Sequence, residues 1–163
     1  MNKRMHWAVF ISNNSHKDQF IKNVLEGPLP EGFDTLEKLN GALFSKITLN
    51  EFIDEEERHG IQIINKNSQQ LLKTMSSGEQ KKALLKYIFH LKPDYIVLDN
   101  PFDNLDKDAQ KDLKASLDHI SKNTFIIQLI SRKADILPFI TQEMILEGSN
   151  IRPLESGSKI IKK

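Results

Sequence analysis

Short apolar runs divide the chain, and polar segments of helical length separate them. Residues 7–11, 95–99 and 124–130 are almost continuously apolar, and each has the length of a β-strand. A run without polar alternation is typical of a strand that is covered on both faces, as in a parallel sheet between layers of helices. We expect one more strand at 143–147.

Three segments between these runs carry apolar residues at helical spacing. The first spans residues 17–26 and is followed by Gly27–Pro28, which is a C-terminal stop signal. The second begins at Ser76–Glu79, where hydroxyl groups precede an acid in the first turn, and it ends before Pro93. The third spans residues 107–121 and has one apolar side.

The remaining segments have weaker patterns. Residues 36–43 suit a short helix, and residues 44–47 suit a strand. The acidic run at 54–57 indicates a short helix with a solvated face that ends near Gly60; without a second cluster of ligands it does not indicate a metal site. Two more short elements are expected, a strand at 61–64 and a short helix that starts at 135–138.

Strands that alternate with helices predict an α/β fold, with a mainly parallel sheet flanked by helices. We find no internal repeat and expect a single domain over residues 1–150, followed by a flexible tail at 151–163. Ligands of such sheets bind in the loops beyond the carboxyl ends of the strands. Three of these loops carry polar residues, namely 12–18, 99–106 and 130–133.

Composition restricts the classes of function. The formal charge is +1, from 23 Lys and Arg against 22 Asp and Glu, so no global attraction to nucleic acid or an anionic membrane is expected. The absence of cysteine excludes disulfides and thiolate chemistry. No apolar run approaches the roughly 20 residues of a membrane helix, and the N-terminus lacks a signal-peptide core. A cytoplasmic protein is therefore expected.

Two features suggest chemistry, and each also has a purely structural explanation. Asp99 follows four apolar strand residues, a position from which a carboxylate can hold Mg²⁺ through water or hydroxyl ligands. An aspartate at the end of a strand also serves as a turn or cap residue. The segment Ser76–Glu79 starts a helix, and it is a good N-cap whether or not a ligand is bound.

Three motifs, in this order, resemble those of the ATP-binding-cassette (ABC) ATPase family. Met75–Gln80 is similar to the signature Leu-Ser-Gly-Gly-Gln, Tyr95–Asp99 to the Walker B strand, and Asn104–Asp106 to the D-loop. Within the family, residues 7–18 resemble the strand and phosphate loop of the soluble molybdate-transport-associated ATP-binding proteins. The resemblance implies a P-loop NTPase-like fold.

The resemblance also implies a set of site residues. Asp99 would hold Mg²⁺, Asn100 takes the position of the catalytic Glu, and Ser131 takes the position of the switch His. The residues implied in ATP binding are Ser12, Asn13, Ser15, Lys17 and Asp18 of the phosphate loop and Ser76, Ser77, Gly78 and Glu79 of the signature.

Several positions depart from the family pattern. A phosphate loop of the form G-x-x-x-x-G-K-[ST] needs glycines so that backbone N–H groups can converge on phosphates. Here Ile11 and His16 replace the glycines, Asp18 replaces the hydroxyl residue, and only Lys17 remains. Asn100 cannot accept a proton from water at neutral pH. The short stretch before Ser76 predicts a reduced helical subdomain.

These patterns favour a degenerate ABC-type domain that binds ATP and Mg²⁺ weakly and hydrolyses ATP poorly. Because domains of this family pair head to tail, the signature helix is expected to complete the ATP site of a partner domain, in a homodimer or a heterodimer. Two alternatives remain open. One is a functional Mg-dependent ATPase subunit of an ABC transporter with a membrane partner, and the other is an interaction scaffold that binds no nucleotide.

Overall fold

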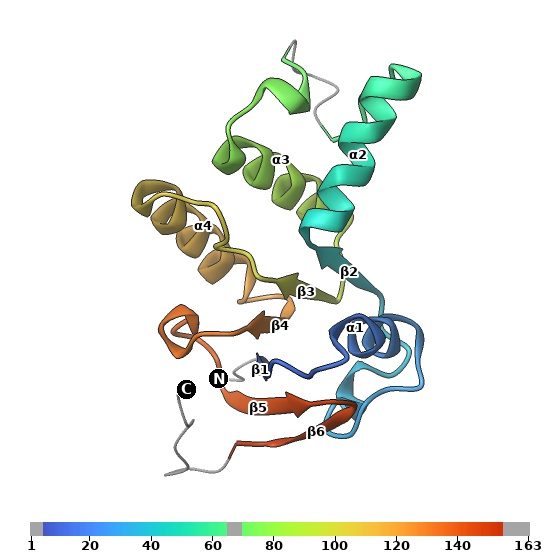
Figure 1. The fold of residues 1–163 in the computed structure, drawn as a ribbon, viewed down its shortest axis with the longest axis vertical. Helices are drawn as coiled ribbons and strands as arrows, with labels where there is room; N and C mark the ends of the chain where they lie inside the picture. Colours follow the sequence, from blue (N-terminus) through green and yellow to red (C-terminus); the bar gives the residue numbers. More distant parts are fainter. Residues whose placement is uncertain (1–4, 65–69, 155–163) are drawn as a thin grey trace.

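The three apolar runs lie side by side in one six-stranded sheet (Figure 1). The computed structural model describes residues 5–64 and 70–154. The strand order is β2-β3-β4-β1-β5-β6; neighbours from β2 to β5 pair in parallel, and β6 pairs antiparallel with β5. The strands are β1 His6–Ile11, β2 Gly41–Phe44, β3 Tyr95–Asp99, β4 Phe125–Ile130, β5 Gln142–Glu147 and β6 Asn150–Pro153. The predicted α/β class with a mainly parallel sheet is confirmed.

Helices cover both faces of this sheet. The α-helices are α1 Lys17–Glu26, α2 Lys46–His59, α3 Ser77–His90 and α4 Lys107–Ile120, and the short 3₁₀ helices are η1 Asp34–Leu36, η2 Leu72–Thr74 and η3 Lys133–Asp135. Alternate residues of the parallel strands enter different cores. Val97 of β3 packs in the core that α1 covers, whereas Leu98 packs in the core that α3 and α4 cover. The absence of polar alternation in the strands follows from this double burial.

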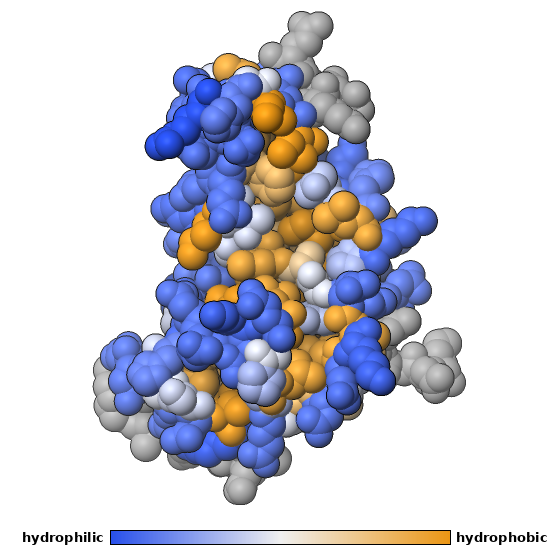
Figure 2. Space-filling view, turned by 90° about the vertical axis from the view of Figure 1, so that its right-hand side faces the viewer, coloured by the Kyte–Doolittle hydropathy of each residue, from blue (hydrophilic) through white to orange (hydrophobic). Residues whose placement is uncertain are grey.

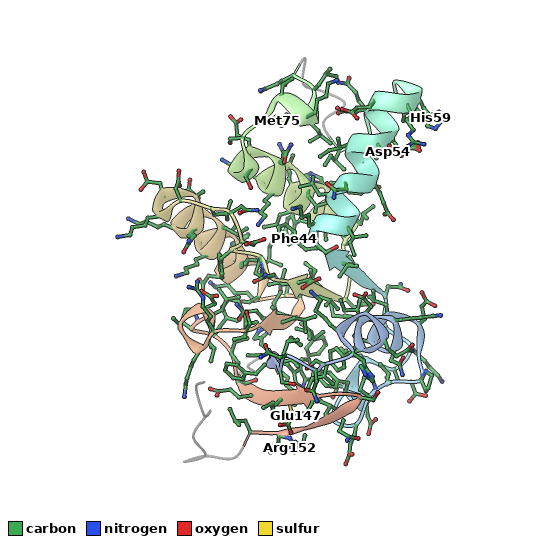
Figure 3. The ribbon with its side chains drawn as sticks, viewed as in Figure 1. Phe44, Asp54, His59, Met75, Glu147 and Arg152 are labelled. Carbon is green, nitrogen blue, oxygen red and sulfur yellow. The ribbon has the colours of Figure 1, made fainter. Side chains whose placement is uncertain are left out.

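The weakly patterned segment before α2 differs from its prediction. No helix spans 36–43 in the described chain; η1 ends at Leu36, and β2 follows at Gly41. The strand expected at 44–47 is wrong because Ser45 caps a helix. Its hydroxyl oxygen accepts the N–H of Thr48 at 3.1 Å, so α2 begins at Lys46. Phe44 lies at the junction of β2 with α2 and α3 (Figure 3).

Four further expectations are corrected. Residues 61–64 form no strand; residues 61 and 62 are irregular, residue 63 is a bend and residue 64 a turn. The short helix expected to start at 135–138 does not form; the 3₁₀ helix η3 lies before it and ends at Asp135. Residues 151–153 belong to β6 rather than a tail, and Glu147 and Arg152 form an ion pair of 3.2 Å across the β5–β6 hairpin (Figure 3). The rest of the expected tail, from residue 155, lies outside the described residues.

The fourth correction concerns the acidic run on α2, which is not uniformly solvated. Asp54 is exposed on α2 and forms an ion pair with Arg58 at 2.8 Å. Glu56 is buried instead, and its Oε1 accepts the N–H of Leu72 at 2.8 Å. This bond attaches η2 to α2. Glu56 therefore has a structural role that could not be recognised from its position in a run of acidic residues.

The part of the chain that contains α2, η2 and α3 forms a small helical unit at one end of the sheet (Figure 1). It carries the large apolar side chains that remain exposed among the described residues, and the face seen in Figure 2 bears an apolar strip between hydrophilic borders. These exposed residues are Ile47, Ile61, Leu71, Phe89 and Leu91. Among the described residues, no helix combines the length and hydrophobicity that a membrane span requires.

Candidate functional site

A cleft of about 360 Å³ opens beyond the carboxyl ends of β2 and β3, where three helices begin. Lys17 enters it from the first position of α1, Lys46 from the first position of α2, and Lys81 from the second turn of α3. Its position matches the expectation that ligands of a parallel sheet bind at this edge. The other lining residues are Phe44, Ser45, Ile47, Leu49, Asn50, Ser77, Gln80, Leu84, Asp99, Asn100, Asp103 and Asn104.

Lys17 and Asp99 form an ion pair in this cleft. The Nζ of Lys17 lies 3.1 Å from the Oδ1 of Asp99; the two side chains are 38% and 11% exposed, respectively. The pair arises because β1 and β3 are parallel and separated by one strand, so the residues that follow their carboxyl ends meet at one edge. The sequence predicted a phosphate-binding lysine and a metal-binding carboxylate, and the fold brings these two groups together.

The turn after β3 places two asparagines in the cleft. Asn100 and Asn104 have φ angles of 55° and 62°, in the left-handed region where asparagine is tolerated better than most residues. Asn100 donates its N–H to the carbonyl of Leu129 at 3.2 Å. The position that the resemblance assigned to a catalytic Glu is therefore one where the backbone conformation itself favours Asn.

The loop between β1 and α1 is closed by its own hydrogen bonds. The hydroxyl of Ser12 donates to the Oδ1 of Asn14 at 2.7 Å and lies 3.0 Å from the hydroxyl of Ser15. Ser15 donates its N–H to the carbonyl of Ser12, and His16 donates its N–H to the carbonyl of Gly148. No residue of the described segment 11–18 has a positive φ.

This loop therefore differs from an anion-binding nest. A nest alternates right- and left-handed residues so that successive N–H groups point at one anion. Ile11 instead continues β1 and pairs with Leu146. His16 also contacts the β5–β6 turn, where its Nδ1 lies 2.7 Å from the hydroxyl of Ser149. The residues that depart from the family's phosphate-loop pattern thus lie in a loop that is hydrogen-bonded to the β5–β6 turn.

The signature segment forms a capping box at the start of α3. The hydroxyl oxygen of Ser76 accepts the N–H of Glu79 at 3.2 Å, and the carboxylate of Glu79 accepts the N–H of Ser76 at 2.9 Å. A Cβ at Gly78 would lie 3.1 Å from the Cβ of Ala109, so glycine allows α3 to approach α4 closely. Ser76 is exposed at this end of the helix.

Lys81 attaches α3 to the turn after β3. Its ammonium donates to the carbonyl of Pro101 at 3.0 Å and to the carbonyl of Asp103. Burial lowers the pKa of Lys81 below its ordinary value; the carboxylate of Asp103 opposes this shift, and the ammonium of Lys46 adds to it. The signature helix and the turn that carries Asn100 are thus joined directly.

The fold gathers some of the implied site residues and separates others. Lys17, Ser77, Asp99 and Asn100 line the cleft together. Ser131 is exposed in the segment after β4 and is not part of the cleft lining in the described structure. A second group of implied site residues is also absent from the cleft lining, namely Ser12, Asn13, Ser15, Asp18, Ser76, Gly78 and Glu79.

Sequence reasoning missed two of the three lysines of the cleft. Lys46 directly follows the cap residue Ser45, and Lys81 follows the signature segment Met75–Gln80. The signal for Lys81 was its position on a recognised helix, one turn after the cap. Lys46 gave no signal, because the segment around it was expected to be a strand. No group of three or more potential metal ligands occurs within residues 5–64 and 70–154.

The strand order and the helical unit before β3 form an α/β fold with a mainly parallel sheet, and this fold is shared by ATP-binding cassettes of known structure. Solved structures agree. An inward-facing ABC transporter of metal-chelate type has a TM-score of 0.64 at 13% identity, covering 94% of this chain and 73% of that chain. MJ1267, an ATP-binding cassette of an ABC transporter in its ADP conformation, has a TM-score of 0.59 at 15% identity, with 93% and 80% covered.

A third structure, cbiO1 of Clostridium perfringens, part of the transporter complex cbiONQ, has a TM-score of 0.59 at 14% identity, with 93% and 78% covered. At these identities the likeness shows the fold. In sequence, the chain is similar to the ABC transporter ATP-binding protein ModF of Escherichia coli (strain K12), 31% identical over 70 residues. That segment is 43% of this chain and 14% of ModF. No family model matches the chain. The resemblance to ABC ATPases is confirmed.

Proposed function

We propose that this chain is a degenerate ATP-binding cassette domain that binds ATP weakly, hydrolyses it poorly and completes the ATP site of a partner domain. The observation that carries the proposal is the closed loop after β1. Two of its N–H groups, those of Ser15 and His16, already donate to carbonyls of the protein. An arriving triphosphate has to replace these bonds, so most of the usual gain from backbone donors is offset.

Binding then depends on side chains in the cleft. Lys17 supplies a cation for the phosphates once it leaves Asp99, to which it is bonded at 3.1 Å. The donor set fits Mg²⁺ as a nucleotide-bound ion, because Mg²⁺ is commonly held by one or two carboxylates together with phosphate oxygens and waters. Asp99 is the carboxylate that would hold it, and the ion would supply charge neutralisation of the phosphates.

Poor hydrolysis follows from the residues at the turn after β3. The amide of Asn100 can orient water by hydrogen bonding but cannot take its proton, and general-base assistance is commonly worth about 10²–10⁴ in rate. Ser131 supplies no titratable group at neutral pH, and it is exposed outside the cleft. Neither position 100 nor position 131 therefore supplies a base that could take a proton from the attacking water.

Completion of a partner site is proposed from the free end of α3. Ser76 uses its hydroxyl oxygen as an acceptor for Glu79, which leaves its proton available to an external acceptor. The exposed N-terminus of a 14-residue helix favours a phosphate group. A phosphate held by a second ABC-type domain, as a homodimer or heterodimer partner, would meet these donors without any demand on the loop after β1.

Calorimetric titration with ATP–Mg tests the binding part of the proposal. We expect a dissociation constant on the order of 1 mM, and we expect Lys17→Ala to weaken it at least tenfold because the chief phosphate cation is lost. Lys22→Ala is the matched control, since Lys22 is exposed on the same helix outside the cleft. Binding below about 10 µM would contradict the closed loop. Absence of heat at all concentrations would favour the scaffold alternative.

Asn100→Glu tests the alternative of a functional transporter ATPase. We expect ATP turnover to stay within threefold of the wild-type rate, since the loop and position 131 remain unsuited to catalysis. Asn104→Glu is the control, because Asn104 lies in the same cleft and has a similar left-handed backbone. A rise of tenfold or more in phosphate release with Asn100→Glu alone would show that the loop and position 131 do not limit turnover, and it would support the ATPase alternative.

A further inference from the structure

Positive charge in the cleft exceeds what the surrounding protein neutralises. Three lysines line it against two aspartates, Asp99 and Asp103. Lys17 is paired with Asp99. Lys81 is bonded only to the backbone carbonyls of Pro101 and Asp103 in the described structure, and carbonyl dipoles do not cancel a full charge.

Lys46 has the least favourable local position of the three. It is exposed at the first residue of α2, where the partial positive charge of the helix end repels a cation. The first turn of α2 contains no acid to offset it. Among the described residues Lys46 has no hydrogen bond or ion pair, and its charge acts on Lys81 across the cleft. Lys46 and Lys81 thus share the cleft, neither has an ion pair among the described residues, and the carboxylate of Asp103 acts on Lys81.

An anionic ligand would relieve this repulsion, and the cleft is large enough for one. Its volume of about 360 Å³ lies within the usual range for small-molecule sites. Lys17 lines the same cleft, so an extended anion can contact all three ammonium groups. A chain of phosphates suits this arrangement, because each phosphate offers several acceptor oxygens to a lysine ammonium group.

We propose that Lys46 and Lys81 form a second phosphate-binding subsite, which holds the distal phosphates of a nucleoside triphosphate while Lys17 contacts the same chain of phosphates. This inference rests on the proposed function and names the groups that replace the lost backbone donors. The ligand is bound by side chains from α1, α2 and α3 of one protomer, and the loop at 12–16 can remain closed.

The test compares Lys46→Gln with Lys82→Gln by calorimetry, using ATP–Mg and inorganic tripolyphosphate as separate ligands. Lys82 provides the matched control: it is exposed on α3 beside Lys81, and it lines the groove between α3 and α4 rather than the cleft. We expect Lys46→Gln to weaken both ligands at least fivefold, whereas Lys82→Gln changes each by less than twofold. We also expect Lys46→Gln to raise the thermal unfolding midpoint of the ligand-free protein, because a cation leaves the start of α2.

Each outcome separates the two proposals. Equal weakening by both variants, or no weakening by Lys46→Gln, overturns the second subsite while the proposed weak ATP site still stands on the Lys17 result. Tripolyphosphate binding that depends on Lys46, without any ATP binding, overturns the proposed function and supports the anion subsite alone. The rise in the unfolding midpoint excludes loss of folding as the cause of weaker binding.

Discussion

Exchange of Gly41 for alanine will destabilise the folded domain by about 3 kcal/mol. A Cβ at this position of β2 would lie 2.2 Å from two ring atoms of Tyr95 on the neighbouring strand. The ring cannot withdraw, because Tyr95 is 1% exposed and its hydroxyl donates to the carbonyl of Val24 in α1 at 2.8 Å. Urea unfolding, followed by circular dichroism, measures the change in the free energy of unfolding.

The control is the same exchange in a Tyr95→Leu background. There the ring atoms that cause the overlap are absent, and alanine is favoured over glycine in a strand by roughly 0.5–1 kcal/mol. Gly41→Ala should therefore become neutral or stabilising in that background. An equal loss of stability in both backgrounds would show that the contact with Tyr95 is not the reason for glycine at this position.

Restoring the phosphate loop will raise the affinity for ATP–Mg by about a hundredfold. The variant combines Ile11→Gly, His16→Gly and Asp18→Ser, so that the segment regains two residues able to adopt positive φ and a hydroxyl beside Lys17. Removal of the Asp18 carboxylate also takes away a negative charge next to Lys17 that would repel a phosphate. Calorimetric titration measures the affinity.

Two comparisons make this experiment decisive. Adding Lys17→Ala to the restored loop should return the affinity to the weak wild-type range, because the loop acts together with this lysine. Asp18→Ser alone should give only part of the gain, since the loop stays tied to Gly148 and Ser149. A restored variant with affinity within threefold of wild type would mean that the loop sequence does not limit binding.

The central strands could be predicted because their burial on both faces removes polar residues from 7–11, 95–99 and 124–130. The start of β2 could not be predicted. Its first residue is a glycine because the ring of Tyr95, on the neighbouring strand, leaves no room for a side chain. The same error displaced α2, because Ser45 was expected within a strand rather than as a helix cap. The missed start of β2 thus depends on a side chain distant in sequence, whereas the missed start of α2 depends on a local cap.

The site was predictable to the extent that motifs mark strand and helix ends. Lys17, Asp99 and Asn100 meet in the cleft because Asp99 ends β3, Asn100 follows it and Lys17 begins α1 at the same sheet edge. Ser131 does not join them, although it also follows a strand, because its side chain is exposed outside the cleft. Lys46 could not be assigned at all, because a single exposed lysine carries no pattern before the fold places it opposite Lys81.

The bond between Lys81 and the carbonyls of Pro101 and Asp103 has a mechanical consequence. Helix α3 carries Ser76 at its outer end and is fastened by Lys81 to the turn that contains Asn100. A tilt of this helix, imposed by a neighbouring subunit or by a ligand, would act on that turn through the Lys81 ammonium and through Leu84 and Leu85, which share a core with Phe102. The start of α3, which carries Ser76, and the turn after β3, which carries Asn100, are therefore expected to move together.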